Sequence, residues 1–100
     1  MAEYGDSIWL DGKIVNRHTG AQVPLLTHTL HYGVGAFEGI RAYQREGGET
    51  RIFRLGDHVQ RLFDSCRLVM IEPSVTPAEV SRGCIEVLQQ NQLRAGYLRP

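Results

Sequence analysis

The segment from Leu30 to Tyr43, LHYGVGAFEGIRAY, places three glycines and three aromatic residues around one glutamate, Glu38, with Arg41 close behind it. Glycines permit sharp turns and let another group approach the backbone closely. Aromatic side chains supply the apolar walls that are typical of small-molecule pockets. This mixture could form a phosphate-binding loop, the wall of a substrate pocket, or a tight turn whose aromatic side chains fill the core.

The glycine spacing argues against nucleotide binding. The dinucleotide fingerprint G-x-G-x-x-G requires its third glycine where this chain has Glu38, and a carboxylate there would bring negative charge toward a pyrophosphate. The segment also lacks the Lys-Ser or Lys-Thr pair of a nucleotide P-loop. We expect a sharp turn at Gly33 and Gly35 and then a short helix that brings Tyr32 and Phe37 close together. The residues alone leave open whether these two rings line a pocket or fill the core.

Two further pairs of residues have spacings that favour interaction. Tyr97 and Arg99 lie two positions apart in a β-prone segment, so both side chains would project from one face of a strand. A phenol and a guanidinium on one face could bind a carboxylate, and the alternative is an edge pair that faces solvent. Glu38 and Arg41 lie three positions apart, and we expect a local ion pair between them.

Local patterns predict the elements that must position these residues, in the order hairpin, glycine motif, hairpin, two helices and strand. In the first hairpin, Asp11-Gly12 tolerates the positive φ angles of a type I′ turn. A loop over 16–29 follows, with a short extended piece near 23–26. The expected ranges are 8–15 and 40–54 for the hairpins, 57–70 and 77–91 for the helices, and 96 onward for the strand.

Apolar periodicity and capping signals define the two helices. In the first helix the apolar residues recur at helical spacing, and Pro73 prevents its continuation. The second helix has a capping box in Thr76 and Glu79, with Pro77 at the first helical position. Gly83 either weakens this helix or marks close packing. The expected buried stripes are Val59, Leu62, Phe63, Cys66, Val69 and Met70 in the first helix, and Val80, Cys84, Val87 and Leu88 in the second.

Helices segregated from antiparallel strands predict an α+β fold, with an antiparallel sheet that carries two helices packed on one face. Residues 1–100 are expected to form one N-terminal small domain of a longer protein, because the last strand has barely begun at Pro100. Composition excludes several functional classes. Net charge is zero and no apolar run reaches membrane-spanning length, so we predict no nucleic-acid or membrane partner. The N-terminal stretch MAEYGDSIWL has an acidic start and no signal-peptide core, so we predict a cytoplasmic location.

The cysteines and histidines do not predict a metal site, because their spacing matches no metal-ligand pattern. Cys66 and Cys84 fall within the helical patterns, and we expect them to be small buried apolar residues rather than a disulfide or metal pair.

The stretch HYGVGAFEGIRAY closely resembles the N-terminal motif of the branched-chain amino acid aminotransferases, which are fold-type IV enzymes dependent on pyridoxal phosphate. Three further stretches resemble the same family in the same order: IWLDGKIV, FRLGDHVQRLFDS and GYLRP. The FEGIR and GYLRP stretches favour this branch over the D-amino acid aminotransferases and aminodeoxychorismate lyases, which share the fold. The resemblance implies transfer of an amino group between leucine, isoleucine or valine and 2-oxoglutarate.

The resemblance also implies roles for individual residues. Arg61 matches the arginine that binds the phosphate of pyridoxal phosphate, and a guanidinium suits that task because it presents a planar fork of donors. Phe37 matches a wall of the side-chain pocket, and Tyr97 and Arg99 match residues that face the substrate carboxylates. Tyr32 matches a residue that reaches into the pocket of a neighbouring subunit, which implies a homodimer.

No catalytic residue is predicted in this chain. In the family, a lysine amine holds the cofactor aldehyde and moves the proton during transamination. The only lysine here is Lys13, beside the Asp11-Gly12 turn, and it does not match the family's lysine. We therefore expect these residues alone to be inactive in transamination. The non-enzymatic alternative is an α+β interaction module that retains the fold without the chemistry.

Overall fold

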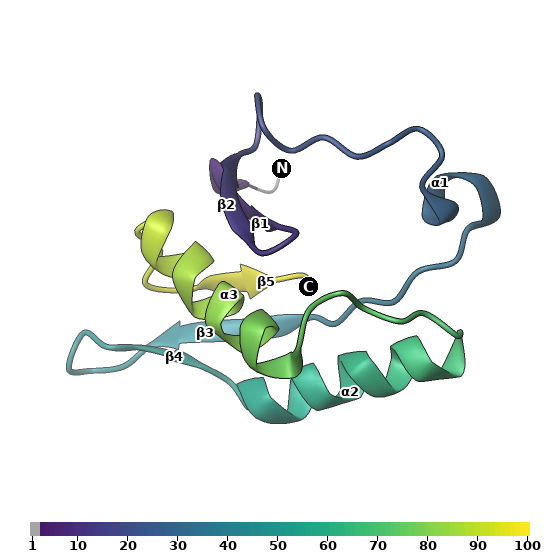
Figure 1. Cartoon of the computed structure of the whole chain (residues 1–100). Helices are drawn as coiled ribbons and strands as arrows, with labels where there is room; N and C mark the ends of the chain where they lie inside the picture. Colours follow the sequence, from purple (N-terminus) through teal and green to yellow (C-terminus); the bar gives the residue numbers. More distant parts are fainter. Residues whose placement is uncertain (1–2) are drawn as a thin grey trace.

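The computed structural model describes residues 3–100, which form two antiparallel sheets and three helices (Figure 1). A two-stranded sheet pairs β1 with β2, and a three-stranded sheet has the order β4-β3-β5. The elements are β1 Ser7–Leu10, β2 Lys13–Asn16, α1 His28–Tyr32, β3 Ile40–Gln44, β4 Thr50–Ile52, α2 Leu55–Leu68, α3 Pro77–Gln90 and β5 Gly96–Leu98. The predicted α+β class is confirmed, but the strands form two sheets where one was expected.

The first hairpin stays separate because it packs on a helix instead of extending the larger sheet. Its turn has φ values of 51° at Asp11 and 87° at Gly12, as a type I′ turn requires. The Trp9 ring lies against Gly83 of α3, where an added Cβ would come within 2.6 Å of Trp9 Cε2. Asn91 adds a second tie, because its side chain accepts from the Ser7 N–H and donates to the Ser7 carbonyl, both at 2.9 Å. Gly83 thus marks close packing.

The core lies between the three-stranded sheet and the two long helices. Alternate residues of β3, Ile40 and Ala42, point toward α2 and α3 and are almost completely buried. The buried members contributed by the other elements are Val59 and Leu62 from α2, Val80, Cys84 and Leu88 from α3, and Leu98 from β5. Both long helices therefore pack on one face of this sheet, as the sequence predicts.

The two long helices differ in how well local signals define their ends. The capping box of α3 is complete: the Thr76 hydroxyl accepts from the Glu79 N–H at 3.2 Å, and the Glu79 carboxylate accepts from the Thr76 N–H at 3.1 Å. The first of these two long helices, α2, ends at Leu68, two residues before the predicted end at position 70. Met70 has a positive φ and a 91% exposed side chain, so its assignment to the buried stripe was wrong. Val69 is also exposed.

The segment between β2 and β3 carries short helix α1 and is mostly exposed, and it runs beside the rest of the chain (Figure 1). The extended piece predicted near 23–26 is absent from the described residues, which form a turn there. The predicted order around the glycines was also wrong, because α1 precedes Gly33 and Gly33 ends it with φ 66°. A glycine in the left-handed conformation commonly ends a helix, so Gly33 terminates the helix before it and does not start one after it.

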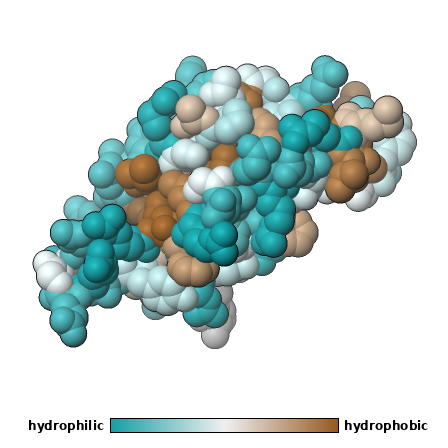
Figure 2. Space-filling view, turned by 90° about the horizontal axis from the view of Figure 1, so that it is seen from below, coloured by the Kyte–Doolittle hydropathy of each residue, from teal (hydrophilic) through white to brown (hydrophobic). Residues whose placement is uncertain are grey.

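Among residues 3–100, the helices lack the combination of length and apolar composition needed to cross a bilayer. Exposed apolar side chains lie in patches separated by polar groups on the face shown in Figure 2.

Candidate active site

Phe37, Tyr97 and Arg99 come together at the edge of the three-stranded sheet. The Arg99 Cζ atom lies 4.6 Å from the centroid of the Phe37 ring and 5.4 Å from that of the Tyr97 ring. One Arg99 nitrogen is 3.5 Å from the Tyr97 hydroxyl oxygen, so that contact is long for a hydrogen bond. We call these three residues the aromatic–arginine cluster. The Phe37 and Tyr97 side chains are both more than half exposed, so Phe37 does not fill the core.

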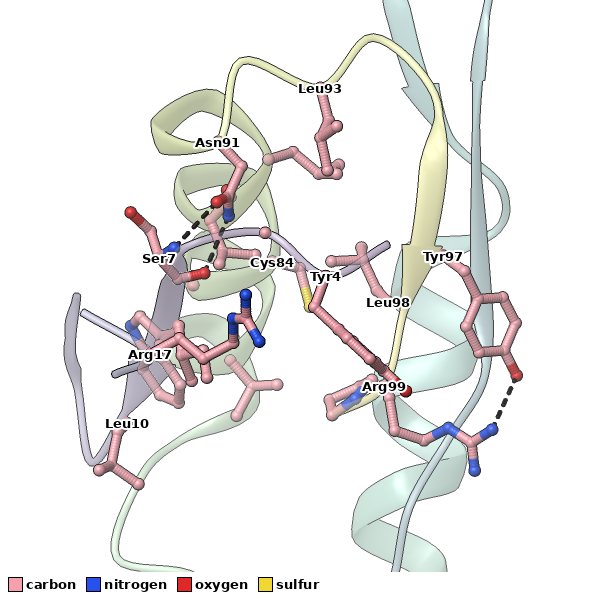
Figure 3. A pocket seen from close by; sticks show the side chains of 18 of the residues that line it. Tyr4, Ser7, Leu10, Arg17, Cys84, Asn91, Leu93, Tyr97, Leu98 and Arg99 are labelled. Atoms are coloured by element: carbon pink, nitrogen blue, oxygen red, sulfur yellow. Dashed lines mark hydrogen bonds between the residues drawn. The ribbon is translucent and has the colours of Figure 1, made fainter. Parts of the chain in front are cut away.

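Gly39 makes room for this cluster. A Cβ atom at position 39 would overlap the Tyr97 hydroxyl, so glycine leaves room for the phenol to approach the backbone of the glycine motif. Close approach of another group is one of the two roles expected for glycines in such a segment. The expected shared face of Tyr97 and Arg99 is also visible, since both side chains extend to the same side of β5 (Figure 3).

Glu38, His58 and Arg61 form a second group, which we call the carboxylate cluster. Glu38 is only 7% exposed, and its oxygens accept from Arg61 Nε at 3.0 Å each. A terminal Arg61 nitrogen, Nη2, lies 2.8 Å from Glu38 Oε1, and His58 Nδ1 lies 2.8 Å from the same oxygen. The carboxylate therefore joins the glycine motif to two residues one turn apart on α2.

The predicted Glu38–Arg41 ion pair was wrong, because the segment is extended rather than helical. In an extended chain, residues an odd number of positions apart project from opposite faces. Glu38 shares the inward face with Ile40 and Ala42, whereas Arg41 is exposed on the other face. The same alternation was a usable signal: a carboxylate in phase with two apolar residues enters the core side and needs a basic partner there.

Two adjacent residues, Phe37 and Glu38, belong to different clusters and contact opposite sides of the sheet. Phe37 contacts Arg99 outside the sheet, and Glu38 contacts α2 inside it. The Glu38 N–H also donates to the Pro100 carbonyl at 2.9 Å, which continues the pairing of this segment beside β5. The backbone therefore couples the position of one cluster to that of the other.

Arg61 retains donors for a further acceptor. Its side chain is 67% exposed, and Glu38 engages Nε and Nη2 from one side. A guanidinium has five N–H donors, so the Nη1 end remains open toward solvent. That donor set fits a phosphate oxyanion, which is the group that the sequence resemblance assigns to Arg61.

Charge pairing alters the pKa values in the carboxylate cluster. The Arg61 hydrogen bond, and next the His58 hydrogen bond, hold the pKa of Glu38 below its ordinary value of 4.5, against the opposing effect of burial. Glu38 in turn raises the pKa of Arg61. Glu38 is therefore ionised at neutral pH and the pair is intact.

The lowered pKa of Glu38 predicts a pH-dependent contribution to stability. A carboxyl whose folded pKa is depressed stabilises the protein above its unfolded pKa, and this contribution is lost as pH falls through the folded value. We expect Glu38→Gln to lower the free energy of unfolding by about 1 kcal/mol at pH 7. Urea unfolding of both proteins should show this difference shrinking as pH falls below 4.5. A difference that stays constant from neutral pH to well below that value would contradict the assignment.

Tyr32 stands apart from both clusters. Its ring makes an edge contact with the His28 ring at 5.5 Å between centroids, within α1. Its side chain is 73% exposed, so it does not fill the core of this chain. The structure thus brings together Phe37, Tyr97 and Arg99 but leaves Tyr32 outside the cluster, and the expected proximity of Tyr32 to Phe37 is not among the contacts that the described residues make.

A cavity of about 470 Å³ lies between β1, α3 and β5, and the sequence analysis did not predict it. Leu98 points into it, whereas Tyr97 and Arg99 border it and extend their side chains toward the other side of the strand (Figure 3). Burial raises the pKa of the Cys84 thiol on its wall to about 11, so this thiol is protonated and unreactive at neutral pH. Cys84 and Cys66 are free and buried, as predicted.

Comparison with known proteins identifies the class. The sequence profile of the class IV amino-transferases matches residues 35–100, which include both clusters. The chain therefore belongs to the class IV aminotransferase family.

Within this family, the chain is similar to branched-chain amino acid aminotransferases. It is 41% identical over 100 residues to the enzyme of Pseudomonas aeruginosa and 39% identical over 95 residues to that of Escherichia coli. It covers 32% and 30% of these two proteins, so it spans about a third of the length of the curated relatives that it matches.

Solved structures agree with this grouping. The Escherichia coli branched-chain amino acid aminotransferase superposes with a TM-score of 0.89 at 35% identity, over 96% of this chain and 31% of that one. The enzyme from T.th., complexed with N-(5'-phosphopyridoxyl)-L-glutamate, superposes with a TM-score of 0.90 at 36% identity, over 96% of this chain and 32% of that one. The fold of residues 3–100 is thus that of the N-terminal part of these enzymes.

Proposed function

We propose that the protein carrying this chain is a branched-chain amino acid aminotransferase dependent on pyridoxal phosphate. It would move an amino group between leucine, isoleucine or valine and 2-oxoglutarate. The observation that carries the proposal is the contact between Arg99 and the Phe37 ring. It sets a cation beside an apolar wall, and such a site can take either an aliphatic side chain or a second carboxylate.

Each residue of the aromatic–arginine cluster then has a task. Phe37 offers apolar surface to the aliphatic side chain of the substrate. The Arg99 guanidinium and the Tyr97 hydroxyl offer donors to a substrate carboxylate. Two structures of the T.th. enzyme support this dual use, since one is complexed with a phosphopyridoxyl derivative of glutamate and another with 4-methylvaleric acid.

Arg61 is the residue of this chain that we assign to the cofactor phosphate. Its open Nη1 end and its exposure suit that role. When bound, pyridoxal phosphate supplies the aldehyde and electron-withdrawing ring that amino-group exchange requires. The chain's own contribution is to hold one end of the cofactor and to shape the adjacent substrate wall.

The lysine that this chemistry requires lies, in our proposal, in a second domain of the protein. Lys13 is exposed beside the β1–β2 turn and does not match the family's lysine. We propose that residues 1–100 are the N-terminal small domain and are inactive by themselves.

We propose further that the protein is a homodimer to which each copy contributes Tyr32. The segment around α1 supports this, because none of the α1 residues is buried. Leu25 and Leu26 are 79% and 75% exposed, and a second copy would remove this apolar surface from water. A cytoplasmic location stays a prediction.

A coupled assay of the whole protein tests the function. With pyridoxal phosphate, leucine and 2-oxoglutarate, we expect glutamate to form at a rate proportional to enzyme, and the isolated hundred residues should give none. Turnover of D-alanine or of aminodeoxychorismate in place of leucine would assign the protein to another fold-type IV activity. No turnover of leucine, D-alanine or aminodeoxychorismate, with no cofactor bound, would favour the interaction module.

A further inference from the structure

We infer that Glu38 is a positioning residue for the cofactor phosphate: it holds the Arg61 guanidinium by one side, so that the opposite end is aimed at the phosphate, and His58 fixes the carboxylate that does so. This inference rests on the proposed role of Arg61. It adds two residues that the sequence analysis did not assign to the site.

The burial of Glu38 requires an explanation. Within residues 3–100 it is the one charged side chain in the buried class. Burying a carboxylate is costly unless it is paired and hydrogen-bonded. The exposed Glu49–Arg51 pair shows that an ion pair of this chain does not require a buried carboxylate.

The geometry of the pair restricts Arg61 to one orientation. Glu38 receives Nε through both oxygens, at 3.0 Å each, and Nη2 at 2.8 Å. A side-on contact of this kind fixes both the position and the plane of the guanidinium. Because Nε and Nη2 form one edge of the guanidinium, the Nη1 donors remain on its other side for a further acceptor. An arginine on a helix surface without such a partner would sample many rotamers.

His58 completes the support from the same helix. Its Nδ1 atom lies 2.8 Å from Glu38 Oε1, and it stands one helical turn before Arg61 on α2. The His58 side chain is only 18% exposed, so its ring packs rather than moves freely. The Glu38 backbone is held as well, through its N–H bond to the Pro100 carbonyl. Arg61 and His58 thus stand on the same helix, and Glu38 lies two residues before β3 with its backbone N–H bonded.

The same arrangement ties the phosphate site to the substrate wall. Glu38 follows Phe37 directly, and Phe37 contacts Arg99. The spacing between a phosphate held by Arg61 and a substrate resting on Phe37 is thus set through a single peptide unit. A positioning role explains why a carboxylate stands beside a cation that must bind an anion.

Electrostatics alone predicts the opposite effect of removing this carboxylate, which makes the inference testable. Glu38→Gln makes the carboxylate cluster one charge more positive, so simple attraction would tighten phosphate binding. Loss of positioning would weaken it. Glu38→Asp separates the two effects further, because it keeps the charge but shortens the side chain by one methylene.

The experiment measures dissociation constants of the whole apoprotein for pyridoxal phosphate and for pyridoxal, which lacks the phosphate, from the absorbance of the bound cofactor. We expect Glu38→Gln and Glu38→Asp to weaken binding of pyridoxal phosphate about tenfold, equivalent to about 1.4 kcal/mol. Pyridoxal binding should change by less than about twofold, because pyridoxal has no phosphate for Arg61 to bind. A purely structural defect would instead weaken the binding of both ligands. Glu49→Gln, which alters the exposed pair with Arg51, is the matched control and should change neither constant.

Arg61→Ala separates the inference from the proposed function. If it leaves the affinity for pyridoxal phosphate unchanged, the proposed role of Arg61 fails. If Arg61→Ala weakens phosphate binding while both Glu38 variants bind as the wild type does, only the positioning role is overturned. Equal losses for pyridoxal and pyridoxal phosphate in the Glu38 variants also overturn it. Should Glu38→Gln not fold, the Glu38→Asp result decides alone.

Discussion

Replacement of Arg99 by alanine should lower kcat/KM for glutamate about 100-fold in the whole protein, which corresponds to about 2.7 kcal/mol. The guanidinium lies 4.6 Å from the Phe37 ring, beside the surface that we assign to the substrate side chain. Without it, the second carboxylate of glutamate would enter an apolar site unpaired, and leaving one such charge without its partner costs about 2–5 kcal/mol. Valine has no carboxylate in its side chain, so its kcat/KM should fall by less than about fivefold.

Single-turnover rates with each amino acid measure this discrimination directly. Arg94→Ala is a suitable control, because Arg94 is exposed and precedes β5 on the same connection, so both rates should be unchanged. Tyr97→Phe should give a smaller loss in the same direction, because it removes one donor and keeps the ring. Equal losses for glutamate and valine in Arg99→Ala would show that Arg99 does not select the side chain.

Replacement of Gly83 by alanine should destabilise the protein by about 2 kcal/mol net, because overpacking against a rigid ring costs about 3 kcal/mol, the upper end of the usual range. The added Cβ would lie 2.6 Å from Cε2, 2.7 Å from Cδ2 and 2.9 Å from Nε1 of Trp9. These three atoms belong to one rigid ring, so relief requires the whole β1–β2 hairpin to shift from α3. The gain in helix propensity from glycine to alanine, about 1 kcal/mol, offsets only part of this cost.

Gly56 provides the matched comparison, since it also lies in a long helix but an added Cβ there meets no atom within 4 Å. Urea unfolding should therefore show Gly56→Ala equal to or slightly more stable than the wild type. Adding Trp9→Leu to Gly83→Ala should cost less than the two separate changes predict, because the clash is removed. Equal stability of Gly83→Ala and Gly56→Ala would refute the packing account.

Local signals predicted most of the elements, because their causes are local. The positive φ angles at Asp11-Gly12 and the Thr76–Glu79 capping box depend on a few neighbouring residues, and both are present. The end of α2 was misplaced because apolar spacing continued to Met70 after the helix had already ended. Periodicity identifies a face but does not fix the terminal residue.

The site was less accessible to local reasoning. Phe37 and Arg99 are far apart in the sequence, and only the resemblance to a family placed both at a substrate site. The Glu38–Arg61 pair was missed because a helical spacing rule was applied to an extended segment, whereas strand alternation places Glu38 on the core side. The separation into two sheets follows from the Trp9–Gly83 contact, which no local pattern specifies.

A crystal structure of the whole protein with pyridoxal phosphate bound tests the central claim most directly. We predict an Arg61 Nη atom about 2.7–2.9 Å from a phosphate oxygen. Glu38 should still be bonded to Nε, and the Phe37 ring should face the substrate side of the cofactor. A phosphate held entirely by other residues, with the Arg61 guanidinium directed into bulk water, would contradict the account.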